Sequence, residues 1–280
     1  MFEVERDYLS LVADTLQFGT LENNDRTGVG TYIYPGGAIL KHSFATGFPL
    51  LTTKRIAYKT MATELEGFIK GVTDKTWYQD RKCRIWDEWS NSKTRPPGRS
   101  QEAWHDLGPI YGAQWRAFNG DVFQDQLRDV INALENRSTS RRLLVTAWNP
   151  LQLDQMALPP CHFAWQVKVR GDHLDLDWYQ RSVDVMLGLP FNLASYGLLL
   201  QLLAYQFGFE PGVLTGHLGH VHIYQNHREG AETILARQPF PLPQLDIQPS
   251  FETTYDFNAQ TDFVVRDYKH HPTVKMEVAV

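Results

Sequence analysis

Two alternating segments constrain the fold of this chain more than any other feature. Residues 163–169 (FAWQVKV) and 173–179 (HLDLDWY) carry apolar side chains at about every second position, which is the pattern of strands with one buried face. Arg170-Gly171-Asp172 lies between them, and Gly-Asp is typical of a turn. The segments therefore predict a β-hairpin, with the Arg-Gly-Asp triplet as its turn rather than an adhesion motif.

Both ends of this hairpin carry residues with reactive or charged side chains. Cys161 and His162 precede the first segment, and Arg181 follows the second. A thiolate is a strong nucleophile when a nearby cation lowers its pKa. We therefore predict that Cys161 is a nucleophile and that Arg181 supplies its activating charge. The other cysteine, Cys83, completes neither a disulfide scaffold nor a zinc pattern of paired cysteines.

Further periodic segments predict helices and another strand. Residues 121–136 show helical spacing of apolar side chains. The apolar segment after Pro190 predicts a buried helix with proline in its first turn. The segment GHVHIY alternates, so His220, His222 and Tyr224 are expected to share one face of a strand.

The composition limits the class of protein. The 280 residues, 42% hydrophobic and 21% charged, suit one large globular domain or two smaller ones, with residues 90–105 as an exposed polar loop. The net charge of -5 argues against general nucleic-acid binding, so an anionic ligand would need a local arginine cluster. The N-terminal segment has no apolar signal-peptide core, and residues 191–203 are too short and polar to span a membrane. We therefore expect a cytoplasmic protein.

Several arginines lie in polar, turn-like contexts that suit a phosphate group, because guanidinium groups and serine hydroxyls bind its oxygens. They are Arg26, Arg141, Arg142 and Arg181, the last followed by Ser182. The alternative is that they are scattered surface arginines, since spacing alone does not show that they converge.

Three other features have both a functional and a structural interpretation. Glu64 lies in a helical apolar pattern, where a carboxyl with a raised pKa can act as general acid or base, or on a solvated helix face. Asn192 starts the predicted buried helix, where its amide can read a pyrimidine edge or bond the helix terminus. Residues 85–89 (IWDEW) suit either the core or a stacking wall for a flat cofactor.

Four histidines, at 217, 220, 222 and 227, lie close together in the sequence. A metal site there would need acidic or cysteine partners at ligand spacing, and the segment has none. Alternation also separates His217 from the face of His220 and His222. We therefore expect no metal.

Taken together, the motifs resemble the folate-dependent, cysteine-nucleophile thymidylate synthase family from end to end. The ordered motifs are DRTG at 25–28, FPLLTTKR at 48–55, IWDEW at 85–89, DLGPIYG at 106–112, QWR at 114–116, SRR at 140–142, MALPPCH at 156–162, QRS at 180–182, LGLPFN at 187–192 and HIY at 222–224. Their number and order are far more specific than any single motif.

The resemblance implies an α/β fold of mixed type, in which a large twisted mixed sheet forms the dimer interface and helices cover its other face. It implies a single domain over residues 1–280, with residues 90–105 as a loop insertion and 270–280 as a tail that closes the active site. It also implies an obligate homodimer in which Arg141 and Arg142 reach the partner active site.

The resemblance further implies a reaction and a role for each site residue. Cys161 would attack carbon 6 of the uracil of dUMP, and 5,10-methylenetetrahydrofolate would supply the one-carbon unit and the hydride that yield dTMP. The catalytic residues would be Cys161, Glu64, Tyr111, His162, Arg181, Asn192 and Asp184. The dUMP site would contain Arg26, Arg141, Arg142, Arg181, Ser182, Asn192, His222 and Tyr224. The folate site would contain Lys54, Ile85, Trp86, Asp184, Leu187, Gly188, Phe191 and Val280.

Four positions depart from the commonest pattern of that family. Glu66-Gly67 replaces a frequent Leu-Trp, and we expect this to loosen local packing. Ala57 stands where a basic residue often helps to bind polyglutamate, which weakens the case for tight polyglutamate binding. His220 stands where aspartate is usual.

Two other functions stay open at this point. A related pyrimidine hydroxymethylase adds water in place of hydride. Asn192 favours uracil over cytosine, and Trp86 with the C-terminal tail favours reduction, whereas His220 leaves a dUMP hydroxymethylase open. A weakly active nucleotide- or RNA-binding member of the family is the other alternative. The presence of Cys161, Glu64, Tyr111 and Arg181 together argues against it.

Overall fold

The computed structural model describes residues 4–23, 27–90, 103–120 and 124–279. Its main sheet runs in the order β1-β2-β7-β6-β5-β4, with β3 also paired to β7. The strands of this sheet are β1 (Thr20–Glu22), β2 (Thr31–Ile33), β3 (Ala38–Ser43), β4 (Leu144–Thr146), β5 (His162–Arg170), β6 (His173–Asp184) and β7 (Glu210–Tyr224). A separate pair consists of β8 (Gln244–Ile247) and β9 (Phe263–Arg266).

The predicted hairpin is confirmed as β5 and β6, which pair antiparallel on either side of the Arg-Gly-Asp turn. Strand β6 extends to Asp184, beyond the predicted end at residue 179. The extension pairs in parallel with β7, including Ser182 with His220 and Asp184 with His222. This partner lies far along the chain, so local alternation gave no sign of the extra length. The sheet is therefore mixed.

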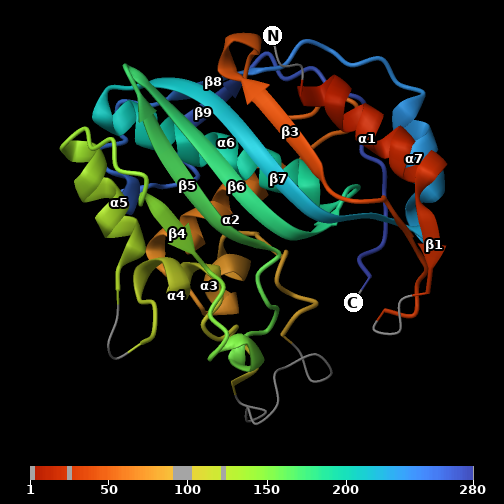
Figure 1. The fold of residues 1–280 in the computed structure, drawn as a ribbon, viewed down its shortest axis with the longest axis horizontal. Helices are drawn as coiled ribbons and strands as arrows, with labels where there is room; N and C mark the ends of the chain where they lie inside the picture. Colours follow the sequence, from red (N-terminus) through yellow and green to blue (C-terminus); the bar gives the residue numbers. More distant parts are fainter. Residues whose placement is uncertain (1–3, 24–26, 91–102, 121–123, 280) are drawn as a thin grey trace.

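The helices lie around this sheet as Figure 1 shows, with α2 and α6 behind β5, β6 and β7 in that view. They are α1 (Val4–Phe18), α2 (Tyr58–Lys70), α3 (Lys75–Asp80), α4 (Tyr111–Arg116), α5 (Gln126–Glu135), α6 (Gly188–Phe207) and α7 (Arg228–Leu235). Short 3-10 turns are η1 (Phe44–Thr46), η3 (Leu153–Gln155), η4 (Gln225–His227) and η5 (Thr254–Asp256). The expected mixed α/β architecture, with helices on one face of a large sheet, is confirmed.

The two helices predicted from periodicity are both present. Helix α6 carries Pro190 near its start and is apolar on most sides, so it packs between the sheet and α2. Helix α5 begins at Gln126 rather than near residue 121, because the Asp125 side chain caps it by accepting the Arg128 N–H. Residues 121–123 lie outside the described part of the chain. No helix in the described ranges has both the length and the hydropathy to cross a bilayer.

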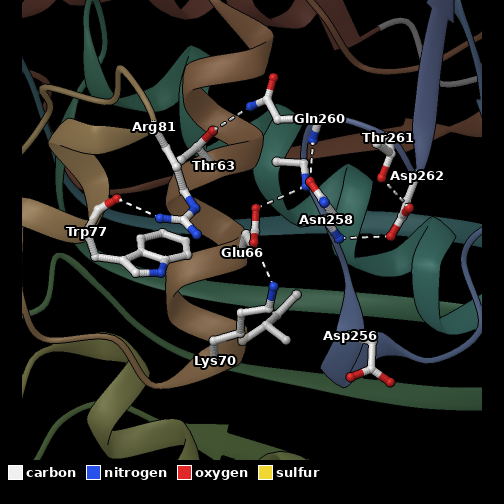
Figure 2. Close-up of polar contacts among 12 residues, drawn as sticks. Thr63, Glu66, Lys70, Trp77, Arg81, Asp256, Asn258, Gln260, Thr261 and Asp262 are labelled. Atoms are coloured by element: carbon white, nitrogen blue, oxygen red, sulfur yellow. Dashed lines mark hydrogen bonds and ion pairs between the residues drawn. The ribbon is translucent and has the colours of Figure 1, made fainter.

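The expectation of loose packing at Glu66-Gly67 is wrong. Glu66 is 3% exposed, and its carboxylate binds Lys70 Nζ at 2.6 Å and the Ala259 N–H at 3.0 Å (Figure 2). Gly67 faces the ring of Tyr78, whose hydroxyl oxygen would lie 2.3 Å from an added Cβ. The ring takes the space of a larger side chain, and the hydrogen bond from the Ala259 N–H to Glu66 ties α2 to the segment after η5. These contacts therefore hold helix α2 firmly at Glu66 and Gly67.

Candidate functional site

The hairpin brings Cys161 and Arg181 together as predicted. Cys161 lies directly before β5, and its backbone oxygen accepts the Arg181 N–H at 2.9 Å. The Arg181 guanidinium donates to the carbonyl oxygens of Pro160 at 2.8 Å and Pro159 at 3.0 Å. The Cys161 N–H donates to the Tyr111 hydroxyl at 2.8 Å. The backbone of the half-buried Cys161 is thus held between an arginine on the sheet and a tyrosine on α4.

An aromatic stack supports the same residues from behind. The Tyr111 ring contacts those of Phe68 at 4.8 Å and His162 at 4.3 Å, measured between ring centroids. His162 Nδ1 lies 2.8 Å from the Tyr196 hydroxyl. Burial lowers the pKa of His162 to about 3. This imidazole is therefore neutral at ordinary pH, and its nearby hydroxyl partner fixes its orientation.

Glu64 projects from α2 into an apolar environment. Its residue is 9% exposed, and burial raises the pKa of its carboxyl to about 8. The nearby Trp86 indole N–H opposes this rise in pKa. That buried N–H has no acceptor within hydrogen-bond distance among the described residues. The carboxyl is protonated over most of the neutral range. It can therefore give and take a proton near pH 7.

The buried Gln180, whose role was not predicted from the sequence, orients Asn192. Trp178 Nε1 donates to Gln180 Oε1 at 3.2 Å. Gln180 Nε2 in turn donates to the Ser182 carbonyl oxygen at 3.0 Å and to Asn192 Oδ1 at 3.1 Å. The sequence offered little signal for this role, because residues 178, 180 and 182 share one face of β6 only in the full strand, which extends beyond the predicted end at residue 179.

The aligned ends of β6 and β7 carry the remaining polar residues of the predicted nucleotide site. Ser182 pairs with His220 and Asp184 with His222, so all four side chains project from the same face of the sheet. His222 is 6% exposed and its ring contacts that of Tyr224 at 5.3 Å. His220, the position that departs from the usual aspartate, places Nδ1 3.2 Å from Nδ1 of His222. His220 thus lies beside His222, the histidine predicted to bind the sugar.

The start of α6 holds the residues predicted to contact a flat co-substrate. Leu187 and Phe191 are half-exposed and four positions apart, so they lie on one face of the first turn. Asp184 Oδ1 accepts the N–H groups of Met186 and Leu187 and holds this turn. Lys54 Nζ donates to the Met186 carbonyl oxygen, and burial lowers the pKa of that amine to about 8. The partly buried apolar face of Leu187 and Phe191 suits contact with an aromatic ring.

Gly188 lies in the same turn, while Trp86 is buried at 3% exposure and Ile85 is half-buried. Burial of Trp86 is consistent with the core interpretation of residues 85–89, and the partial exposure of Ile85 leaves a rim available for stacking. The stacking interpretation stays a prediction for Ile85.

The structure does not bring every predicted residue to Cys161. Arg141 and Arg142 are exposed in the loop that precedes β4. Arg26 and Val280 lie outside the described residues. Within residues 4–23, 27–90, 103–120 and 124–279, no group of three or more His, Cys, Asp or Glu side chains is placed to hold a metal ion.

The C-terminal segment lies along the body of the protein. The His271 N–H donates to the Thr52 carbonyl oxygen at 2.8 Å, and His227 Nε2 lies 2.7 Å from the Glu277 carbonyl oxygen. Arg237 Nη1 donates to the carbonyl oxygens of Thr53 and Pro272. These contacts anchor the tail at several points.

A sequence profile described as thymidylate synthase matches residues 6–280, which is nearly the whole chain. The chain belongs to the thymidylate synthase family. This assignment confirms the resemblance inferred from the motifs, and it fits a transferase of dTMP biosynthesis that uses methylenetetrahydrofolate.

Proposed function

We propose that this protein is a thymidylate synthase that converts dUMP and 5,10-methylenetetrahydrofolate into dTMP and dihydrofolate. One observation carries the proposal: the Cys161 backbone is hydrogen-bonded to both the Tyr111 hydroxyl and the Arg181 backbone. The Arg181 guanidinium also donates to the carbonyl oxygens of the two prolines that precede the cysteine. A cation at that place favours the thiolate form of a cysteine. The geometry supports a nucleophile presented at the end of a rigid hairpin.

In this proposal Cys161 Sγ attacks carbon 6 of the uracil ring, which makes carbon 5 nucleophilic. Arg181 and Ser182 bind the phosphate, with Arg26 and with the partner subunit's Arg141 and Arg142. His222 and Tyr224 bind the deoxyribose hydroxyl. The exposure of Arg141 and Arg142 is compatible with a reach into another subunit.

Proton transfer at the base is assigned chiefly to Glu64. Its carboxyl, with a pKa near 8, can donate to the carbonyl oxygen at carbon 4 as negative charge develops there. His162, with a pKa near 3, is neutral and therefore acts through its bond to Tyr196 rather than as an imidazolium donor. Tyr111 acts beside them by holding the Cys161 backbone.

The folate co-substrate supplies the one-carbon unit and the hydride when it is bound. The half-exposed face of Leu187 and Phe191 would stack against its ring system, beside Ile85 and Trp86, with Asp184 and Gly188 in the adjoining turn. Lys54 would lie near the glutamate tail. The C-terminal tail, which includes Val280, would exclude water from the intermediate. Water is the nucleophile that competes with the hydride.

A homodimer is part of the proposal. The face of β5, β6 and β7 opposite α6 carries a shallow hollow of about 500 Å³, lined in part by Ile39, Phe163, Tyr179 and His217. Ile39 is 61% exposed. An apolar sheet face of this kind suits a second copy of the chain.

The deciding experiment is incubation with dUMP and 5,10-methylenetetrahydrofolate, followed by mass measurement of the nucleotide and absorbance of the folate product. We expect dTMP with stoichiometric dihydrofolate. Hydroxymethyl-dUMP with tetrahydrofolate would instead identify a dUMP hydroxymethylase, and binding without turnover would identify a binding protein. Cys161→Ala should abolish turnover and largely keep dUMP binding, so full activity in that variant contradicts the mechanism.

A further inference from the structure

His220 and His222 contact one another near the end of β7. Their Nδ1 atoms lie 3.2 Å apart, and His222 Nδ1 also lies 3.1 Å from the backbone oxygen of His220. The ring centroids are 5.2 Å apart. His220 is exposed, whereas His222 is buried at 6% exposure. An imidazole that solvent can reach thus touches the buried ring that is predicted to bind the sugar.

The backbone oxygen decides which ring nitrogens carry protons. A carbonyl oxygen only accepts hydrogen bonds, so His222 carries its proton on Nδ1 and donates it to that oxygen. Neutral His222 therefore has its lone pair on Nε2, which can accept a hydrogen bond from a hydroxyl group. The same Nδ1–H faces Nδ1 of His220, so His220 presents a lone pair there. The carbonyl and the ring of His220 thus fix the tautomer of His222.

A second proton on the His220 ring is incompatible with this contact. A protonated imidazole carries an N–H on both nitrogens, so two N–H groups would point at each other across 3.2 Å. Histidine is the side chain that ordinarily changes its charge between about pH 5 and 8, and exposure gives water access to this one. The His222 ring has to turn or shift in order to separate the two groups.

The elements on this side of β7 bring one carboxylate near the two histidines. Ser182 pairs with His220 and Asp184 with His222. Asp184 Oδ1 accepts two N–H groups of the turn that follows β6. Helix α6 carries no charged side chain, and Ile33, the partner of His222 on β2, is apolar. Asp184 is therefore a constant background when His220 is replaced.

Titratable groups also approach from α1 and from the segment after β7. Glu5 on α1 is buried, and its carboxylate accepts hydrogen bonds from residues 52–53. Tyr8 on the same helix donates to a backbone oxygen directly after β6. His227 contacts Tyr224 at 5.5 Å between ring centroids, and its Nε2 lies 2.7 Å from a carbonyl oxygen of the C-terminal segment. Each of these groups is engaged by a partner of its own.

We propose that His220 is a positioning residue, which holds the His222 ring with its Nε2 lone pair toward the 3′-hydroxyl of the bound deoxynucleotide and releases that hold when its own ring takes up a proton. The inference rests on the proposed function, because that function places the deoxyribose hydroxyl at His222. The contact with the 3′-hydroxyl should therefore weaken as the pH falls from 8 to 5.5.

The test compares dUMP with 2′,3′-dideoxyuridine monophosphate, which lacks the 3′-hydroxyl. Both nucleotides carry the same phosphate, so the ratio of their dissociation constants cancels the titration of the phosphate and its attraction to a charged His220. Calorimetry on the full-length protein without folate measures this ratio at pH 5.5 and 8. We expect wild type to prefer dUMP by about tenfold at pH 8 and to lose most of that preference at pH 5.5.

Two replacements of His220 separate its ring from its charge. His220→Asp supplies a carboxylate that can accept from His222 Nδ1 and stays ionised at pH 5.5, so its preference for dUMP should be about tenfold at both pH values. His220→Ala keeps only the backbone carbonyl, so we expect a smaller preference, about threefold, that does not change with pH. His173→Gln, at an exposed histidine on β6, is the matched control and should follow wild type.

A wild-type preference that is the same at both pH values would overturn the positioning role, and so would an equal fall in wild type and His220→Asp. If His220→Asp does not fold, judged by circular dichroism, a wild-type profile in His220→Ala refutes the role of the ring. Equal binding of the two nucleotides by wild type at pH 8 also refutes the inference. Absence of any dUMP binding by wild type would refute the proposed function itself, whereas tight dUMP binding with an unchanging ratio refutes the positioning role alone.

Discussion

The Tyr111 hydroxyl accepts the Cys161 backbone N–H at 2.8 Å, which connects α4 directly to the predicted nucleophile. The tyrosine is buried in contact with Phe68 and His162, so its hydroxyl has little freedom to move. The position of Cys161 therefore depends on a helix that lies 50 residues earlier in the chain.

Tyr111→Phe should lower kcat by about tenfold or more and change the KM for dUMP less. The variant leaves the Cys161 N–H without its acceptor, at a cost of about 1–3 kcal/mol, and releases the loop that carries the thiol. Steady-state kinetics of dTMP formation measures the effect. Tyr205→Phe, at a tyrosine 50% exposed on α6, is the control. Wild-type kcat in Tyr111→Phe would show that the bond is dispensable.

Glu64→Gln should remove a pH dependence of stability. The folded pKa of about 8 lies above the ordinary value of 4.5, so the native state holds a proton that the unfolded chain releases between these pH values. The contribution of Glu64 to the free energy of unfolding is thus greatest below about pH 4.5. It falls as the pH rises toward 8, by at most ~1.4 kcal/mol per pH unit.

Urea unfolding at pH 5, 6.5 and 8 measures that slope. The wild-type free energy of unfolding should fall more steeply across this range than that of Glu64→Gln. Glu22→Gln changes an exposed carboxyl and serves as the control. Equal slopes in wild type and Glu64→Gln would mean that the fold does not hold Glu64 neutral.

His162→Gln should have the opposite effect at acid pH. Burial lowers the pKa of His162 from 6.5 to about 3, so the unfolded chain binds a proton that the native state excludes. The contribution to stability is complete above about pH 6.5 and is lost as pH falls toward 3. Acid unfolding followed by circular dichroism should show a shallower loss in the variant, while exposed His173→Gln keeps the wild-type curve. A variant as acid-sensitive as wild type refutes this assignment.

Gly67→Ala should destabilise the protein by about 1–3 kcal/mol, although alanine is the better helix former. The added methyl group would overlap the Tyr78 ring, with contacts of 2.3 to 2.5 Å. Thermal unfolding of a double-mutant cycle with Tyr78→Ala separates the two effects. In the Tyr78→Ala background the same substitution should be neutral or stabilising, because the clash is gone. A destabilisation of equal size in both backgrounds would point to a cause other than the ring.

Local patterns predicted much of this architecture for clear physical reasons. Alternation around the Arg-Gly-Asp turn predicted the hairpin, and apolar continuity after Pro190 predicted α6. The same patterns failed at the end of β6, where pairing with the distant β7 sets the boundary. They also misjudged Glu66-Gly67, because spacing could suggest Lys70 as a partner of Glu66 but could not reveal the distant Ala259 N–H or the Tyr78 ring.

The sequence by itself determined the family, the hairpin and the proximity of Cys161 to Arg181, since a short turn brings both ends of a hairpin together. Only the tertiary structure decided the protonation of Glu64 and His162, because a pKa follows from the burial that distant segments provide. It also decided the amide orientation of Asn192, which depends on a hydrogen-bond chain from Trp178 through Gln180. Residue types are written in the sequence, but the direction of a hydrogen bond depends on which partners the fold places within reach.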